Sequence, residues 1–177
     1  CLRCMLRHKL HQVKDQVRKG LWEREDNRGH ELSKMTVGLL GLGNSGLAVA
    51  KKLEGFGCQV IAYDKYLDKS IAPKYLVDEA AFFKKVDILS LHIPLTSETN
   101  SLLTSAYLSQ FAKSIYFINV SRGEVALLGE LRSAIDSGKI IKAALDVLEC
   151  ERFSQMSPAQ KNDFQWLKDS GKVIFTP

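Results

Sequence analysis

The sequence has no apolar run long enough to cross a membrane, and its start lacks the pattern of a secretory signal peptide. Its four cysteines include one C-x-x-C pair, Cys1 and Cys4, but no second pair and no histidine pair at zinc spacing. These absences argue against a membrane protein and against a zinc domain. We therefore expect a cytoplasmic protein with reduced, structural thiols and no metal site.

A basic stripe of the kind that binds nucleic acid is also lacking. The 25 Lys and Arg residues and 20 Asp and Glu residues leave a net charge of +5, and the positive residues are scattered, apart from a group near the start. This distribution favours a solvated face over a nucleic-acid surface. A length of 177 residues with 45 % hydrophobic residues suits one globular domain with a sizeable core.

The two ends of the chain suggest a longer protein. Apolar residues at helical spacing predict a leading helix over residues 1–20, closed by Gly20, and residues 21–34 read as a polar connector whose Trp22 we expect at an edge of the core. The chain opens inside this helix without a start methionine and stops directly after a strand. We expect residues 1–177 to be a single domain and a fragment of a larger, two-domain enzyme.

The glycine motif G-x-G-x-x-G is the organising feature of the sequence. Gly41, Gly43 and Gly46 follow the apolar run 37–40 and precede a stretch with helical periodicity. The first glycine permits a tight turn, the second lets a pyrophosphate approach the backbone, and the third lets the helix pack closely. The helix N-terminus would then present free N–H groups to the diphosphate. This pattern predicts the opening βαβ unit of a dinucleotide-binding domain.

An acidic residue closes the second predicted strand of that unit. Asp64 ends the run CQVIAYD, where its carboxylate would accept hydrogen bonds from the adenosine ribose hydroxyls and would repel a 2′-phosphate. NAD is therefore favoured over NADP. Lys65, the next residue, is a cation and argues in the other direction.

Strands alternate with helices through the rest of the chain. Asp78 and Thr104 are the expected N-caps of two short helices, a third helix is expected over 130–136, and a fourth surrounds Trp166. The predicted strands cover residues 37–40, 58–64, 86–91, 115–120, 141–145 and 173–175. This alternation predicts an α/β fold with a doubly wound parallel sheet of Rossmann type, covered by helices on both faces.

In such a sheet, ligands bind outside the carboxyl ends of the strands. The residues expected there, besides the glycine turn and Asp64, are 92–96, 121–123, 146–151 and Pro177. An arginine, Arg122, and several carboxylates thus converge on the predicted cofactor crevice.

Taken in order, these segments resemble a known family. GLGNSG, YD, VDILSLHIPLTSETNSLL, INVSRGEV, ALDVLECE and VIFTP are similar to the cofactor domain of the D-isomer-specific 2-hydroxyacid dehydrogenases, over essentially the whole chain. WEREDNRGHEL and the polar stretch after Glu151 are most similar to members like D-3-phosphoglycerate dehydrogenase. The resemblance implies an NAD-dependent oxidoreductase that transfers a hydride between nicotinamide and a D-2-hydroxy acid, with D-3-phosphoglycerate as one possible substrate.

The resemblance also implies roles for single residues. Arg122 matches the arginine that grips the carboxylate and keto oxygen of the substrate, a task that suits a planar, permanently charged group. Asp146 matches the acid that holds the nicotinamide carboxamide. Glu151 matches the glutamate that pairs with the catalytic histidine and raises its pKa, and Glu149 is the competing candidate. In the family pattern that histidine follows Thr-Pro, where this chain ends at Pro177.

The resemblance implies a further set of cofactor contacts. His92 belongs there to a segment that lines the adenosine side, so its expected role is structural or at the cofactor edge, not acid-base catalysis. The expected cofactor-binding residues are Gly41, Gly43, Asn44, Ser45, Gly46, Asp64, His92, Pro94, Thr99, Val120, Ser121 and Asp146.

Three departures from the family pattern stand out. Ser45 occupies a position that is usually Ile or Met, which removes an apolar contact near the pyrophosphate turn. Residues 126–128 replace the usual Val-Asp-Glu, so the helix after the SRG segment loses its acidic cap. The substrate domain that flanks the cofactor domain in the family is missing.

Two other classes of function stay open on the sequence. Some relatives of this family are NAD-sensing corepressors that act through partner docking, and these can keep Arg122 and Glu151. A free-standing nucleotide-binding module is the third reading. As partners we expect a small 2-hydroxy or 2-oxo acid and a second copy of the chain in a homodimer, because the first helix has an apolar stripe and related enzymes pair through this domain.

Overall fold

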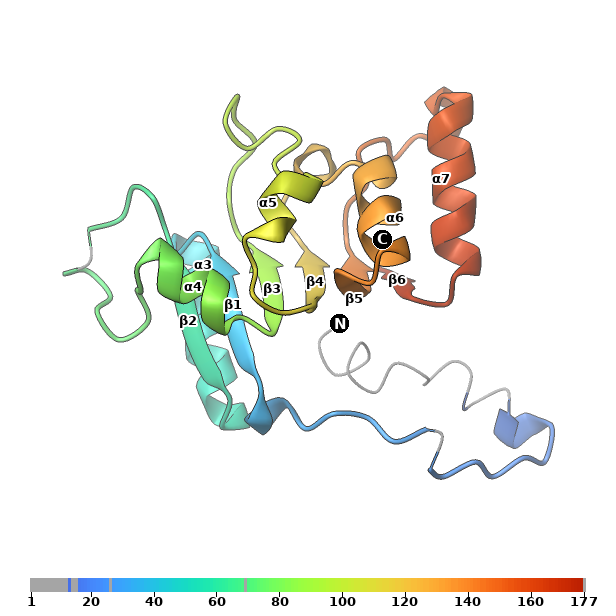
Figure 1. Cartoon of the computed structure of the whole chain (residues 1–177), viewed down its shortest axis with the longest axis horizontal. Coiled ribbons are helices and arrows are strands. Elements are labelled where there is room, and N and C mark those ends of the chain that lie inside the picture. The colour runs from blue at the N-terminus through green and yellow to red at the C-terminus, as the bar shows by residue number, and fades with distance from the viewer. Residues whose placement is uncertain (1–12, 14–15, 26, 69, 177) are drawn as a thin grey trace.

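The computed structural model describes residues 13, 16–25, 27–68 and 70–176. Most of the predicted leading helix therefore lies outside the described residues, but residues 16–18 are helical and Gly20 follows them with a φ of +75°, as predicted for a helix end. The expectation for Trp22 is wrong, because its side chain is 82 % exposed. The connector around it runs away from the sheet (Figure 1).

Six parallel strands form a single sheet. They are β1 (Thr36–Leu40), β2 (Gln59–Tyr63), β3 (Ile88–Leu91), β4 (Ile115–Asn119), β5 (Ile140–Leu145) and β6 (Val173–Phe175). Their order in the sheet is β2-β1-β3-β4-β5-β6, so the chain adds β2 on one side of β1 and all later strands on the other. The predicted doubly wound parallel sheet is confirmed.

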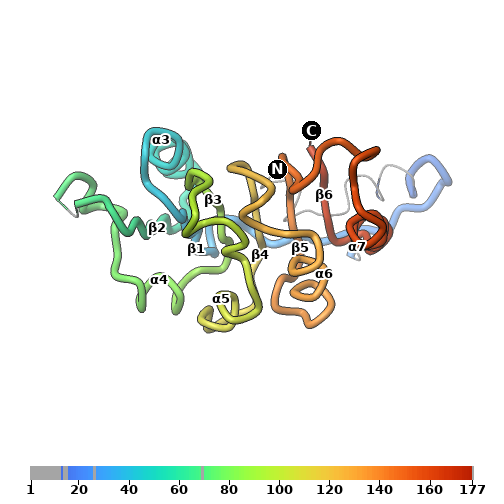
Figure 2. The backbone as a smooth tube through the Cα atoms, turned by 90° about the horizontal axis from the view of Figure 1, so that it is seen from above, coloured from blue at the N-terminus to red at the C-terminus, as the bar shows by residue number. Residues whose placement is uncertain are grey.

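The connecting helices lie on both faces of this sheet. Figure 2 shows α3 above the sheet and α4, α5 and α6 below it. The helices are α3 (Asn44–Leu53), α4 (Glu79–Lys85), α5 (Ser105–Ser109), α6 (Leu128–Asp136) and α7 (Pro158–Asp169), and single 3₁₀ turns are η1 (Leu32–Lys34), η2 (Glu54–Phe56), η3 (Gly123–Val125) and η4 (Phe153–Gln155). The reversal of winding direction between β1 and β3 explains this split, because right-handed crossovers to opposite sides of β1 place their helices on opposite faces.

Side-chain caps mark the starts of three helices. The Asp78 carboxylate accepts the Ala81 N–H at the start of α4, and the Thr104 hydroxyl accepts the Tyr107 N–H at the start of α5, so both predicted caps are confirmed. Ser157 and Gln160 form a reciprocal capping box at the start of α7. These caps satisfy N–H groups that a helix leaves without internal partners.

The third strand and the helix after Arg122 each begin two residues away from the predicted position. The third strand begins at Ile88, not at Val86, because the Val86 N–H still bonds to the Phe82 carbonyl at the end of α4. The helix expected from Glu130 begins at Leu128.

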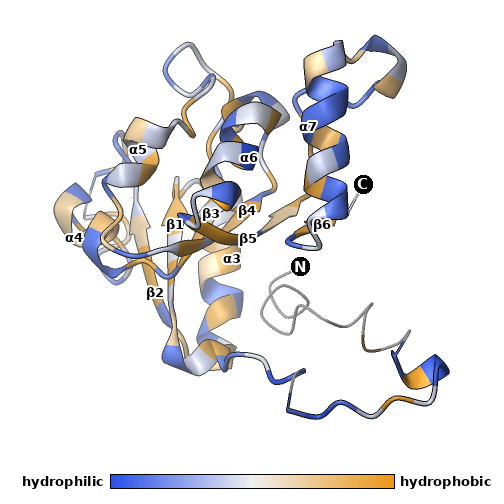
Figure 3. Cartoon of the chain, turned by 45° about the vertical axis from the view of Figure 1, so that its right-hand side comes forward, coloured by the Kyte–Doolittle hydropathy of each residue, from blue (hydrophilic) through white to orange (hydrophobic). Residues whose placement is uncertain are grey.

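The core fills both sides of the sheet. Strands β1, β3 and β4 are buried along their whole length, as expected for parallel strands covered on two faces. On the face of α4, α5 and α6, the rings of Phe82, Phe83 and Phe111 meet at centroid distances of 4.8–6.2 Å. In Figure 3 the strands are mainly hydrophobic while hydrophilic residues line much of α7. This core fixes the strand ends from which the candidate site is built.

Candidate functional site

The glycine turn lies between β1 and α3 at the carboxyl edge of the sheet, the edge toward which the β3 and β4 arrows point in Figure 1. Gly41 has a φ of +89°, and a Cβ on Gly46 would lie 2.3 Å from the Gly41 carbonyl oxygen. These two positions therefore require glycine. A Cβ on Gly43 would meet nothing within 4 Å, so this side of the turn is open.

The start of α3 suits an anionic ligand. Gly43, Asn44 and Ser45 are exposed, and no side chain caps the helix at Gly43. The first N–H groups of a helix have no internal acceptor and form the positive end of its dipole. The open glycine turn and these uncapped amides together fit a diphosphate.

Asp64 follows β2 and is tied to the glycine turn. Its Oδ2 accepts the Leu42 N–H at 2.8 Å, and its Oδ1 accepts the N–H groups of Tyr66 and Leu67 at 3.0 and 3.1 Å. The Oδ2 atom, which accepts one N–H, keeps a further lone pair for a ligand hydroxyl. The structure thus places Asp64 beside the turn, as predicted, and adds a role in shaping it.

His92 lies beneath the glycine turn. Its Nε2 is 3.0 Å from the Ser90 hydroxyl and its Nδ1 is 3.4 Å from the Ser45 hydroxyl, while its Cβ would contact a Cβ on Gly46. Burial lowers the pKa of His92 below its usual value, which favours the neutral ring. The serine that departs from the family pattern thus faces a histidine where an apolar contact is usual.

The turn after β4 is held by a residue that the sequence reading missed. Asn119 is buried, its Oδ1 accepts the Ser121 N–H at 3.0 Å, and its Nδ2 donates to the Arg122 carbonyl at 2.9 Å. Ser121 in turn accepts the Ile93 N–H with its hydroxyl at 3.2 Å, which joins the loops after β3 and β4. The sequence signal that could have identified Asn119 is an amide side chain at the last position of an otherwise apolar strand.

Gly123 allows two loops to touch. A Cβ at this position would lie 1.9 Å from the Leu148 carbonyl carbon and 2.3 Å from the Glu149 nitrogen, both backbone atoms. The loop that carries Arg122 therefore packs directly against the loop after β5. This contact brings Arg122 and Glu151 to the lining of the same hollow, which also includes Val147.

The structure separates the two candidate glutamates. The Glu149 Oε2 accepts the Leu128 N–H at 3.3 Å, at the first residue of α6, whose N-cap Leu127 has no capping side chain. Glu149 thus supplies from a distant loop the acidic group that residues 126–128 lost. Glu151 is exposed and lines the hollow. Its carboxylate forms no hydrogen bond with the side chains that the structure describes.

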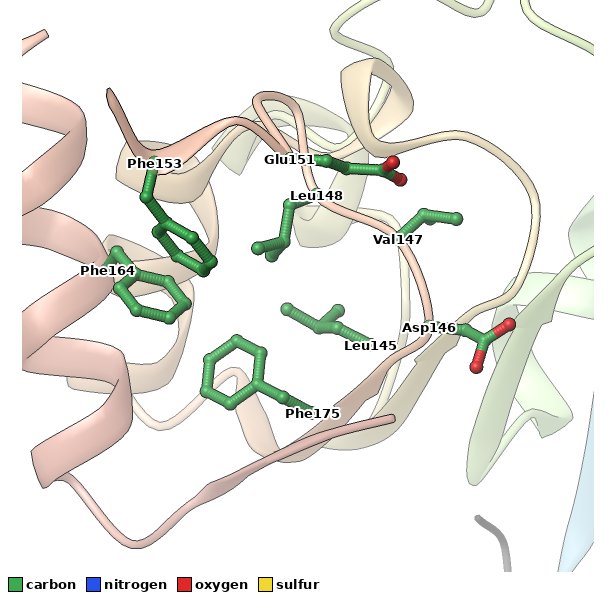
Figure 4. Close-up of a pocket in the computed structure, with 8 residues that line it drawn as sticks. All are labelled: Leu145, Asp146, Val147, Leu148, Glu151, Phe153, Phe164 and Phe175. Atoms are coloured by element: carbon green, nitrogen blue, oxygen red, sulfur yellow. The ribbon is translucent and has the colours of Figure 1, made fainter. Parts of the chain in front are cut away.

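Asp146 and Glu151 border a pocket on the other side of the same loop. Figure 4 shows both carboxylates pointing away from an apolar group formed by Leu145, Leu148, Phe153, Phe164 and Phe175. The Phe164 ring lies 5.0 Å from that of Phe153 and 5.1 Å from that of Phe175. The Thr176 hydroxyl donates to the Asp146 Oδ1 at 2.9 Å. These contacts support the loop from within and leave its acidic groups on the outside.

The remaining predicted cofactor contacts lie in the loops after β3 and β4. Thr99 is folded back, with its hydroxyl donating to the Pro94 carbonyl at 2.7 Å, while Val120 is 39 % exposed. Pro177 lies outside the described residues. The other predicted site residues lie at the carboxyl edge of the sheet, and their assignments to ligand atoms stay predictions. Glu98, which bonds Lys65 and Tyr66 across this edge, was missed because nothing in its sequence neighbourhood marks it.

Two further observations concern the part of the chain that the structure describes. No three His, Cys, Asp or Glu side chains there gather into a group that could hold a metal ion, and Cys58 and Cys150 are both free thiols. Among the helices of this part, none is long and apolar enough to span a bilayer.

With this geometry in place, comparison with known proteins decides the family. Residues 2–177 match the family model of the D-isomer specific 2-hydroxyacid dehydrogenase, NAD binding domain. The chain belongs to this family. Its cofactor is NAD, which fits the open glycine turn and Asp64, and the resemblance seen in the sequence is confirmed.

The relatives of this chain are named for different substrates. The chain is 43 % identical over 125 residues to a D-specific alpha-keto acid dehydrogenase of Enterococcus faecalis, covering 70 % of this chain and 38 % of that protein. It is 34 % identical over 158 residues to the D-3-phosphoglycerate dehydrogenase of Archaeoglobus fulgidus, covering 88 % and 30 %. Both relatives are named as enzymes, which does not favour the corepressor reading.

Solved structures agree on the fold. The D-lactate dehydrogenase of Aquifex aeolicus, complexed with NAD and lactic acid, superposes with a TM-score of 0.87 at 27 % identity, covering 99 % of this chain and 56 % of that one. The chain thus spans less than half the length of the two sequence relatives and about half of this structure.

The Gly123 contact leads to a stability prediction. Replacing Gly123 with Ala should lower the free energy of unfolding by about 3 kcal/mol, the upper end of the cost of overpacking, because the new methyl group meets backbone atoms that cannot rotate away. Urea unfolding followed by circular dichroism would measure this.

Gly55→Ala is the matched control, since a Cβ there meets nothing within 4 Å, and its effect should stay within about 1 kcal/mol. Equal stability of the Gly123→Ala variant and the parent chain would contradict the proposed loop contact.

Proposed function

We propose that the protein transfers a hydride between NAD and a D-2-hydroxy acid or its 2-oxo acid. The observation that carries this proposal is the hollow that Arg122 and Glu151 line together. Glu151 belongs to the loop after β5, which begins with Asp146. The bound nicotinamide would accept or supply the hydride. The chain's own residues would bind the substrate, orient it and control the proton.

Arg122 is the proposed substrate anchor. Its guanidinium is exposed at the carboxyl edge, and its Nη1 donates to the Ser121 carbonyl at 2.8 Å. No carboxylate of the described residues lies within ion-pair distance of it, so most of its N–H donors are available. A 2-oxo acid offers adjacent carboxylate and carbonyl oxygens, which this planar donor set matches.

Glu151 is the proposed partner of the acid-base histidine. Of the two histidines that the structure describes, His92 contacts Ser90 and Ser45, and His30 lies against the ring of Tyr116. Neither contacts Glu151. We therefore propose that the histidine is supplied by residues other than these, and that Glu151 stabilises its protonated form.

Asp64 is proposed to select NAD over NADP. The chain should bind NADH more tightly than NADPH, because the Asp64 carboxylate accepts a ribose hydroxyl but repels a phosphate. Isothermal titration calorimetry with both cofactors checks this, and Asp64→Asn should reduce the preference by about tenfold, the factor that 1.4 kcal/mol represents.

Asp68→Asn is a suitable control for this measurement. Asp68 also accepts a backbone N–H, from Ser70, and it is exposed in the loop that follows β2. Equal affinities for the two cofactors in the parent chain would remove Asp64 from its proposed role.

The catalytic assignments call for a measurement with a protein that also contains the flanking sequence. The 177-residue chain alone should bind NADH but not reduce hydroxypyruvate, 2-oxoglutarate or other 2-oxo acids. In the longer protein, Arg122→Lys should lower kcat/KM by at least about a hundredfold, because lysine cannot form the paired hydrogen bonds. Initial rates of NADH oxidation measure both.

Glu151→Gln should change the pH profile in that protein. Without the negative charge, the pKa of the histidine falls, so the rate of 2-oxo acid reduction, which needs the protonated ring, should decline at a lower pH than in the parent. Glu149→Gln serves as the comparison, and an identical pH profile in Glu151→Gln and the parent would disprove the pairing. The same assay over a substrate panel that includes the D-3-phosphoglycerate couple would identify the substrate.

A homodimer is the proposed assembly, in the cytoplasm as the sequence predicts. Trp22 and Leu21 are 82 % and 48 % exposed, on the arm that leaves the body of the domain (Figure 1). Together with Val17, which is 46 % exposed, these neighbouring side chains form an exposed apolar group of the kind that marks an interaction surface. Sedimentation velocity at micromolar concentration should show a dimer, and Trp22→Ser should shift it toward monomer while Phe56→Ser should not; a monomeric parent chain would refute the proposal.

A further inference from the structure

Three side chains form a charged bridge across the cofactor edge of the sheet. The Glu98 Oε2 lies 2.8 Å from the Lys65 Nζ and accepts the Tyr66 hydroxyl at 2.7 Å. Lys65 and Tyr66 directly follow Asp64 at the end of β2, while Glu98 belongs to the loop after β3. In the sheet, β1 lies between these two strands. The bridge therefore joins the loops on either side of the glycine turn.

This bridge controls a cation that stands next to the ribose acid. The Asp64 Oδ1 accepts the Tyr66 and Leu67 N–H groups, so the backbone around Lys65 is held, and the position of its four-carbon side chain is set by Glu98. A lysine ammonium beside the ribose is the kind of group that a 2′-phosphate would attract. In the structure that ammonium is instead neutralised by Glu98.

The titration behaviour of the three groups agrees with the geometry. The Glu98 carboxylate raises the pKa values of Lys65 and Tyr66, while the Lys65 ammonium and the Tyr66 hydroxyl hold the pKa of Glu98 below its usual value. All three groups are solvent-exposed, so the bridge is an equilibrium that substitution or salt can shift.

We propose that Glu98 is a specificity-determining residue that maintains the preference for NAD by holding the Lys65 ammonium away from the 2′ position. The inference rests on the proposed role of Asp64 at the ribose. Asp64 supplies the repulsion of a 2′-phosphate, and Glu98 prevents the neighbouring cation from cancelling it. The two residues act on the same ribose through different atoms.

The experiment is a double-mutant cycle on cofactor affinity. NADH and NADPH are titrated calorimetrically at low ionic strength into the parent chain, Glu98→Gln, Lys65→Met and the double variant. Glu98→Gln should tighten NADPH binding about fivefold and leave NADH binding within about twofold, since a released lysine forms one exposed charge-assisted contact. In the Lys65→Met background, Glu98→Gln should change NADPH affinity less than twofold, about the limit at which independent sites add.

A matched control exists in the same chain. Glu54 accepts from Lys74 and Tyr75, again a Lys-Tyr pair bound to one glutamate, but it follows α3 at the opposite edge of the sheet. Glu54→Gln should leave the ratio of the two affinities unchanged.

The outcomes separate this inference from the proposed function. A parent chain that binds NADH, combined with an unchanged NADPH affinity in Glu98→Gln, would overturn the role of Glu98 alone. A gain that persists without Lys65 would show that Glu98 acts through its own charge, which also overturns the proposal. A parent chain that binds neither cofactor would refute both.

Discussion

The close approach of backbone to backbone at Gly123 is the constraint on which the catalytic half of the site depends. The loop after β4 carries Arg122, the loop after β5 carries Asp146, Glu149 and Glu151, and these loops touch where a side chain would collide with the Leu148 carbonyl. Once this contact is made, Glu149 reaches the start of α6, while Glu151 is left exposed in the lining of the same hollow as Arg122. A missing side chain thus determines where three charged ones lie.

The rest of the site is held by polar groups that satisfy turns. Asp64 bonds three N–H groups, two of them in its own loop and one in the glycine turn, and Asn119 bonds both ends of the turn that carries Arg122. A ligand-binding loop of this kind is ordered before the ligand arrives, which reduces the entropy lost on binding. The same carboxylate that would recognise a ribose therefore also prepares the glycine turn that would receive the diphosphate.

The sequence predicted the fold well because its signals are local. The strand, glycine turn, helix and acid of residues 37–64 lie in one stretch, and the caps Asp78 and Thr104 act within three residues of themselves. Contacts between residues far apart in the sequence could not be predicted. The substitution of residues 126–128 indicated a helix without its acidic cap, but only the fold shows that Glu149 replaces it. Trp22 was misplaced for a related reason, since an apolar residue in a polar connector does not reveal whether its partner lies in the same chain.

The strand order also determines how soon each half of the site can assemble. The glycine turn and Asp64 belong to a single βαβ unit, so the loop that must close to join them is short. The Arg122 hollow requires β4 to pair with β5, and this pairing also closes a single βαβ unit, with a chain separation close to that between β1 and β2. The pairing of β1 with β3 spans a longer stretch of chain, and closing larger loops costs more chain entropy and slows folding. The two halves of the crevice can therefore form independently before the pairing of β1 with β3 brings them together.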